Sequence, residues 1–115
     1  MEAIRKGPTM SYERMSVSEL KALLDQGEKL RLIDVRTPME REIAAIEPST
    51  LLDEALFETL VEDDDGTPVV LYCHHGIRSA SAAAFFAHKG LQRAINLEGG
   101  IDAWSLAIDP AVERY

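Results

Sequence analysis

The single cysteine of this 115-residue chain, Cys73, stands in the stretch that holds most of the residues able to do chemistry. The apolar run Val69–Tyr72 leads into it and has the pattern of a buried parallel strand. A short loop around Gly76 follows, and a helix rich in small residues is predicted from about Ser79. The thiol is therefore predicted at the carboxyl end of a strand, facing the amino end of a helix. Open α/β sheets bind their ligands at this position.

This position favours a reactive thiolate. A helix N-terminus presents free N–H groups and a partial positive charge, and Arg78 adds a full one. Both stabilise the thiolate relative to the thiol. The loop from His74 to Arg78 can also turn backbone N–H groups inward as an anion nest, with Gly76 free to adopt a positive φ. The alternative is an unreactive buried cysteine, which is common; the loop, the arginine and the helix together favour a nucleophile.

The composition argues against several classes of function. The chain has 12 Lys and Arg against 20 Asp and Glu, a net charge of −8 and a pI near 4.8. This balance argues against binding to nucleic acid or to anionic membranes. One cysteine can form neither an internal disulfide nor a Cys-x-x-Cys site. No apolar run is long enough to span a bilayer, and the first residues lack the apolar core of a secretion signal. We therefore expect a cytoplasmic protein with a reduced thiol.

The rest of the chain alternates strand-like and helix-like segments. Residues 1–11 form a loose lead-in, and residues 12–115 are expected to form a single domain. Predicted strands cover about 12–15, 30–35, 50–52, 69–72 and 93–97, and predicted helices begin near Ser16, Thr37, Asp53, Ser79 and Glu98. This alternation predicts an α/β fold with a mostly parallel sheet of four or five strands and helices on both faces.

A polar pair ends the strand predicted at 30–35. Asp34 lies in a run of Leu, Ile and Val, where a carboxylate is costly to bury unless it is paired. Its natural partners are Arg36 or the N–H groups of a neighbouring strand end. Thr37 and Glu40 have the spacing of a capping box for the next helix. The pair is expected to hold the site in place without taking part in the chemistry.

These segments together resemble the rhodanese family, sulfurtransferases that carry sulfur as a cysteine persulfide. The resemblance spans roughly Ser16 to Trp104, and it rests on the strand and loop 69–78, on Asp34-Val35-Arg36 with the Thr-Pro and Glu that follow, and on Gly99-Gly100-Ile101-x-Ala-Trp. Six residues run from Cys73 through Arg78, the loop length that accompanies sulfur transfer in that family. Related cell-cycle phosphatases have a loop one residue longer.

Two further segments bear on the resemblance. Residues 41–52 depart from it, because the family usually has a Gly-His-Ile-x-Gly-Ala stretch there. Because of this departure, the resemblance does not predict the local backbone or the shape of one wall of the cleft. The tail, Asp109–Tyr115, is similar to the tails of rhodanese domains fused to ubiquitin-activating-type adenylyltransferases in cofactor biosynthesis.

The resemblance implies a single-domain thiosulfate sulfurtransferase. Cys73 would take sulfur from a small anionic donor such as thiosulfate, and would pass it to cyanide in vitro or to a thiol or sulfur-carrier protein in the cell. Arg78 would bind the donor. The other residues expected to contact substrate are His74, His75, Gly76, Ile77 and Ser79, while Asp34 and Arg36 support the site.

No cofactor and no metal are expected. The pair His74-His75 lacks further ligands at the usual metal-binding spacing, so both side chains are expected to line the loop and face solvent. Two alternatives remain open. One is a protein-tyrosine-phosphatase-like or arsenate-reducing enzyme that uses the same cysteine and arginine, and the other is a non-catalytic rhodanese-like interaction module.

Overall fold

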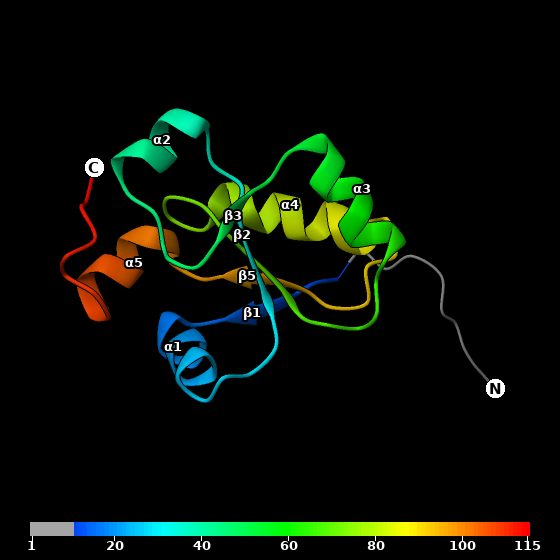
Figure 1. Cartoon of the computed structure of the whole chain (residues 1–115), viewed down its shortest axis with the longest axis horizontal. Helices are drawn as coiled ribbons and strands as arrows, with labels where there is room; N and C mark the ends of the chain where they lie inside the picture. The colour runs from blue at the N-terminus through cyan, green and yellow to red at the C-terminus, as the bar shows by residue number, and fades with distance from the viewer. Residues whose placement is uncertain (1–10) are drawn as a thin grey trace.

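A single five-stranded sheet forms the centre of the protein (Figure 1). The computed structural model describes residues 11–115, so all of the expected lead-in except Ser11 lies outside the described residues. The strands are β1 Glu13–Met15, β2 Arg31–Asp34, β3 Thr50–Leu51, β4 Val69–Tyr72 and β5 Ala94–Leu97. They are ordered β1-β5-β4-β2-β3, and every neighbouring pair is parallel. The predicted α/β class and parallel sheet are confirmed.

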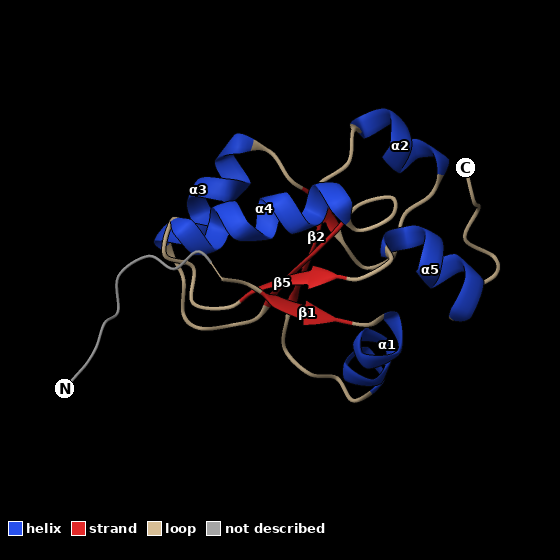
Figure 2. Cartoon of the chain, turned by 180° about the vertical axis from the view of Figure 1, so that it is seen from behind, coloured by secondary structure: helices blue, strands red, loops and turns tan. Residues whose placement is uncertain are grey.

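Helices cover both faces of the sheet. They are α1 Val17–Asp25, α2 Pro38–Ile43, α3 Glu54–Glu62, α4 Ile77–His88 and α5 Gly100–Ala107. Figures 1 and 2 show α3 and α4 on one side of the sheet and α1 with α5 on the other. The longest described helix has 12 residues, and none of those within 11–115 has the length and apolar character to cross a membrane.

The position of β4 at the centre of the sheet explains why its sequence is apolar throughout. Val70 and Tyr72 pack in the core under α1 and α5, whereas Val69 and Leu71 pack in the core under α3 and α4. All four residues are buried. A parallel strand covered on both faces has no solvent-facing side, so it reads as a continuous apolar run. Cys73 follows at the carboxyl edge of this strand.

Most helix starts lie where the sequence predicted them. Ser16 and Thr37 each form a complete capping box, with Glu19 and Glu40 respectively. Helix α4 differs, because it begins at Ile77, two residues before the expected Ser79. Gly76 is its N-cap and adopts a left-handed φ of 99°, which a residue with a side chain rarely adopts. The N-terminus of α4 therefore lies directly beside Cys73.

Candidate active site

The loop after β4 places Cys73 between α2 and α5. Figure 1 shows this loop as the yellow-green turn that leads into α4, with the C-terminus close to α2 on the same side. The thiol is buried, with 1% of the residue exposed. The loop is held from outside by α5, whose Ile101 N–H donates to the Cys73 carbonyl at 2.9 Å and whose Asp102 N–H donates to the His74 carbonyl at 3.1 Å.

These two bonds orient the peptides of the loop. A trans peptide directs its N–H away from its carbonyl. Because the carbonyls of Cys73 and His74 point toward α5, the N–H groups that follow them point into the loop. The backbone of the loop thereby forms the nest of N–H donors that the sequence predicted.

The sulfur atom lies within hydrogen-bonding distance of three donors from this nest and the helix start. Gly76 N–H donates to Cys73 Sγ at 3.1 Å, Ser79 N–H donates at 3.3 Å, and the Ser79 hydroxyl lies 3.3 Å away. Burial of the thiol opposes its ionisation, but the donors of Ser79 and Gly76 outweigh burial and hold the pKa of Cys73 below its usual value. The site therefore favours a thiolate nucleophile.

Asn96 is a polar residue of the site that the sequence analysis did not identify. It is buried in β5, and its Oδ1 lies 2.5 Å from the Ser79 hydroxyl. Its Nδ2 donates to the Gly76 carbonyl at 3.2 Å and to Glu98 at 2.7 Å. Ser79 has one hydroxyl proton, so it donates to either Asn96 or the sulfur. The sequence signal that indicates such a residue is a polar amide within the otherwise apolar strand Ala94–Leu97.

The two adjacent histidines occupy different environments. His75 is exposed as expected, and its Nε2 lies 3.7 Å from Asp102 Oδ2. His74 is half-buried, so the expectation that it faces solvent is wrong. Its ring stacks between His75, at a centroid distance of 4.0 Å, and Tyr115, at 3.9 Å. Among the described residues, its Nε2 is a buried atom without a hydrogen-bond partner.

His74, His75 and Asp102 are the group within residues 11–115 that could approach a metal ion. Their potential ligand atoms lie within 4.8 Å of one another. The Asp102 carboxylate is already engaged by Arg114, whose Nε donates to Oδ1 at 2.8 Å. Binding a cation with this carboxylate would therefore compete with an existing ion pair.

Arg78, the residue expected to bind the donor, is paired with a carboxylate. Its two terminal nitrogens donate to the two oxygens of Glu40 at 2.8 Å each. Tyr115 donates its hydroxyl to Glu40 Oε2 at 2.7 Å. These bonds, that from Arg78 above all, hold the pKa of Glu40 far below its usual range and raise that of Arg78. The sequence pattern predicts only a capping role for Glu40 and no role in the site for Tyr115.

Asp34 and Arg36 form the buried lock that the sequence predicted. The side chains of both are fully buried, and Arg36 donates to the two carboxylate oxygens at 2.9 and 2.8 Å. Arg41 and the Tyr72 hydroxyl also donate to Asp34, at 3.0 and 3.2 Å. Burial raises the pKa of Asp34, but the bonds from the arginines outweigh it and lower the pKa overall. Arg36 also donates to the Tyr115 hydroxyl at 3.0 Å, which connects the buried pair to Glu40.

The same buried network anchors the atypical segment 41–52. Arg36 donates to the Ala44 carbonyl at 2.6 Å, and Arg41 donates to the Ser49 carbonyl at 2.6 Å. Ile46 N–H donates to the Tyr72 hydroxyl at 3.2 Å. Arg36, Arg41 and Tyr72 therefore hold this stretch in place without the glycines and histidine that the family usually has there.

Known proteins share the sequence pattern and the fold of this chain. Residues 16–107 match the family model described as Rhodanese-like domain. The chain belongs to the rhodanese-like domain family. A crystal structure of a rhodanese-like domain protein from Staphylococcus aureus superposes with a TM-score of 0.69 at 25% identity, covering 90% of this chain and 98% of that one. The predicted family and fold are confirmed.

Two curated relatives are named sulfurtransferases. The probable adenylyltransferase/sulfurtransferase MoeZ of Mycobacterium tuberculosis is 40% identical over 100 residues, which cover 84% of this chain and 26% of MoeZ. The thiosulfate sulfurtransferase GlpE of Pseudoalteromonas translucida is 28% identical over 106 residues, which cover 91% of this chain and all of GlpE. The chain thus spans about a quarter of MoeZ. These relatives support sulfur transfer as the general activity.

Proposed function

We propose that this domain is a sulfurtransferase that carries sulfane sulfur as a persulfide on Cys73. The observation that carries the proposal is the set of hydrogen bonds from Gly76 and Ser79 to the sulfur of Cys73. These donors stabilise a negative charge on the first sulfur and lie beside the space in which a second sulfur would bind. The membership in the rhodanese-like family and the names of the relatives support the same chemistry.

The reaction has two half-reactions with a covalent intermediate. In the first, the Cys73 thiolate attacks the outer sulfur of a donor such as thiosulfate. An S–S bond forms to Cys73, the donor's own S–S bond breaks, and sulfite leaves with the electron pair. In the second, a thiophilic acceptor attacks the terminal sulfur and Cys73 leaves as a thiolate. No external oxidant is needed, because the outer sulfur of the donor is already sulfane sulfur. No general base is needed where Cys73 reacts as its thiolate, which the lowered pKa of Cys73 favours.

The proposed acceptor in the cell is a thiol or a sulfur-carrier protein, with cyanide as the acceptor in vitro. The residues proposed to contact donor or acceptor are Arg78, His74, His75, Gly76, Ile77 and Ser79, of which Gly76 and Ser79 are buried beside the sulfur. We also propose a cytoplasmic location, because this chemistry requires a reduced cysteine and the cytoplasm keeps thiols reduced.

The test is the intact mass of the reduced protein after incubation with thiosulfate or an alkyl persulfide. We expect one added sulfur, about 32 Da, lost again on addition of cyanide with release of thiocyanate. Cys73→Ser is the control and should gain nothing. An unchanged mass with both donors would contradict the proposal. Release of phosphate from an aryl phosphate, abolished by Cys73→Ser, would instead establish phosphatase chemistry at the same loop.

A further inference from the structure

The charge of Arg78 is already neutralised by a carboxylate. Both of its terminal nitrogens donate to Glu40, in a bidentate pair whose side chains are 47% and 17% exposed. Thiosulfate and carboxylates are both oxyanions that the planar guanidinium recognises with the same donors. A dianionic donor must therefore either displace Glu40 from this pair or use the remaining N–H groups of a guanidinium whose charge is already balanced.

Glu40 is fixed in place by more than Arg78. Its Oε1 accepts from the Thr37 N–H at 3.2 Å and from the Thr37 hydroxyl at 3.1 Å, which is its capping-box contact. Its Oε2 accepts from the Tyr115 hydroxyl at 2.7 Å. If Arg78 turned toward a ligand, these bonds would keep the carboxylate at the mouth of the site. The fixed negative charge of Glu40 would then repel a dianion, and Glu40 would also compete with the dianion for Arg78.

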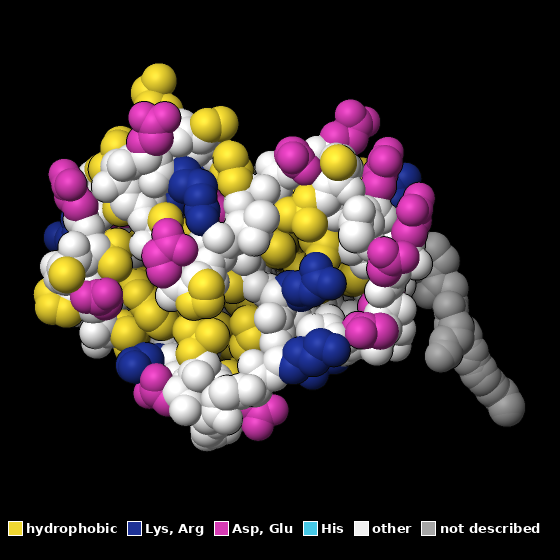
Figure 3. All heavy atoms as spheres, viewed as in Figure 1, with side chains coloured by type: hydrophobic (Ala, Val, Ile, Leu, Met, Phe, Trp, Pro, Cys, Tyr) yellow, Lys and Arg dark blue, Asp and Glu magenta, His cyan; other side chains and the backbone are white. Residues whose placement is uncertain are grey.

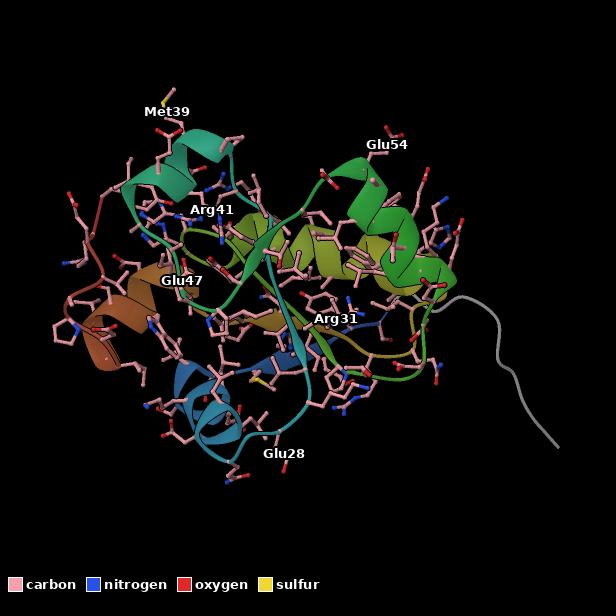
Figure 4. The ribbon with its side chains drawn as sticks, viewed as in Figure 1. Glu28, Arg31, Met39, Arg41, Glu47 and Glu54 are labelled. Carbon is pink, nitrogen blue, oxygen red and sulfur yellow. The ribbon has the colours of Figure 1, made fainter. Side chains whose placement is uncertain are left out.

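Two exposed apolar side chains are the sequence neighbours of this ion pair. Met39 precedes Glu40 and Ile77 precedes Arg78, and these two side chains are 75% and 79% exposed. Figure 4 shows Met39 directed away from the fold at α2, while Arg41 on the same helix points inward. Figure 3 shows acidic side chains over α3 and also on the side of the molecule where α2 lies. An uncharged donor body can contact an apolar side chain such as Ile77 without losing solvation of a charge, whereas a dianion approaches a surface that already carries negative charges.

We propose that Glu40 is a specificity-determining residue, which occupies Arg78 and thereby disfavours small dianionic sulfur donors relative to donors with an uncharged body, such as an alkyl persulfide. This inference rests on the proposed function. With an alkyl persulfide, the Cys73 thiolate attacks the terminal sulfur of R–S–SH, the S–S bond breaks, and R–S⁻ leaves. The products are a protonated persulfide on Cys73 and a thiolate, so atoms and charge balance. Glu40 acts through Arg78 and does not contact the reacting sulfur atoms.

The test compares two donors in Glu40→Gln and in wild type. Glutamine keeps the capping box at this position, because Ser/Thr-x-x-Gln serves as well as Glu, but it cannot neutralise Arg78. We expect kcat/KM for thiosulfate to rise about fivefold, mainly through KM, as expected for release of one exposed ion pair. Values for 2-hydroxyethyl persulfide should stay within about twofold. The matched control is Glu42→Gln, which removes the same charge from an exposed position on α2.

A binding measurement separates this inference from the chemistry. In a Cys73→Ser background, which removes the nucleophile, we expect Glu40→Gln to tighten thiosulfate binding about fivefold by calorimetry. Equal changes for both donors, an equal gain in Glu42→Gln, or no gain in thiosulfate binding would overturn the role of Glu40. Absence of sulfur transfer from both donors to the wild type would instead overturn the proposed function itself.

Discussion

The backbone of Gly100 lies directly against the carbonyl group of Cys73 and that of the residue after it. A Cβ atom added at Gly100 would come to 2.5 Å from the Cys73 carbonyl oxygen and 2.6 Å from that of His74. This close approach allows the N-terminus of α5 to donate its N–H groups to the loop, and it requires a residue without a side chain. Gly100 also has a φ of 60°, which favours glycine independently.

We therefore predict that Gly100→Ala destabilises the protein by more than the backbone conformation alone explains. A left-handed φ costs about 1–2 kcal/mol for a residue with a side chain, and the overlap with two carbonyl groups adds to this. Gly27→Ala is the matched control, since Gly27 has a φ of 71° and nothing within 4 Å of the added Cβ. Urea unfolding of both variants measures the difference. Equal losses would show that the loop adjusts freely to α5.

Ser79 provides the second prediction, which concerns the reactivity of the thiol. Ser79→Ala removes the hydroxyl donor but keeps the backbone N–H, so the pKa of Cys73 should rise toward that of an ordinary thiol. The rate of alkylation by iodoacetamide as a function of pH reports this pKa. Ser81→Ala, at an exposed position on the same helix, is the control. If both variants titrate like the wild type, the hydroxyl is committed to Asn96 and does not stabilise the thiolate.

The pH dependence of the proposed first half-reaction follows from the same thiolate. Because the hydrogen bonds lower the pKa of Cys73, the fraction of thiolate at a given pH exceeds that of a free cysteine. The rate of persulfide formation should therefore rise with pH and level off below the ordinary pKa of a cysteine thiol, about 8.5. Single-turnover measurements between pH 5 and 10 would show this curve, and a rate that keeps rising above pH 9 would contradict it.

The sequence predicted the local parts of the fold and the site. The strand before Cys73, the cap at Thr37 and the glycine turn before α5 depend on residues close together in the chain, so their patterns are visible without a structure. The catalytic loop is of the same kind, because its donors, Gly76 and Ser79, lie within six positions of Cys73.

The contacts that the sequence did not reveal join distant segments. Glu40 forms hydrogen bonds with Arg78, 38 positions away in the sequence, and with Tyr115, 75 positions away. Glu40 has an adequate local explanation as a capping residue, so nothing in its neighbourhood indicates a second partner. The half-buried position of His74 likewise depends on the ring of Tyr115, which the fold of the tail brings over the loop. Such pairings are decided by packing of whole elements.

The buried pair Asp34–Arg36 gives a prediction about stability. Arg36→Met leaves Asp34 as a buried carboxylate that has lost its main partner, and breaking a buried pair in this way costs about 3–5 kcal/mol. Arg93→Met removes an exposed arginine that pairs with Glu13, where a loss of at most about 1 kcal/mol is expected. Urea unfolding at pH 7 compares the two variants. Similar small losses would mean that Arg41 and Tyr72 suffice to hold Asp34.

The pair Glu40–Arg78 should make stability depend on acid pH. The pKa of Glu40 is depressed in the folded protein relative to its ordinary value of 4.5, so its ionised form stabilises the fold above that value. This stabilisation is lost as the pH falls below about 4.5, because the unfolded chain then binds a proton that folded Glu40 does not. The difference in unfolding free energy between wild type and Glu40→Gln should be constant from pH 6 to 8 and shrink toward pH 3. A difference that stays constant down to pH 3 would show that Arg78 does not hold Glu40 in solution.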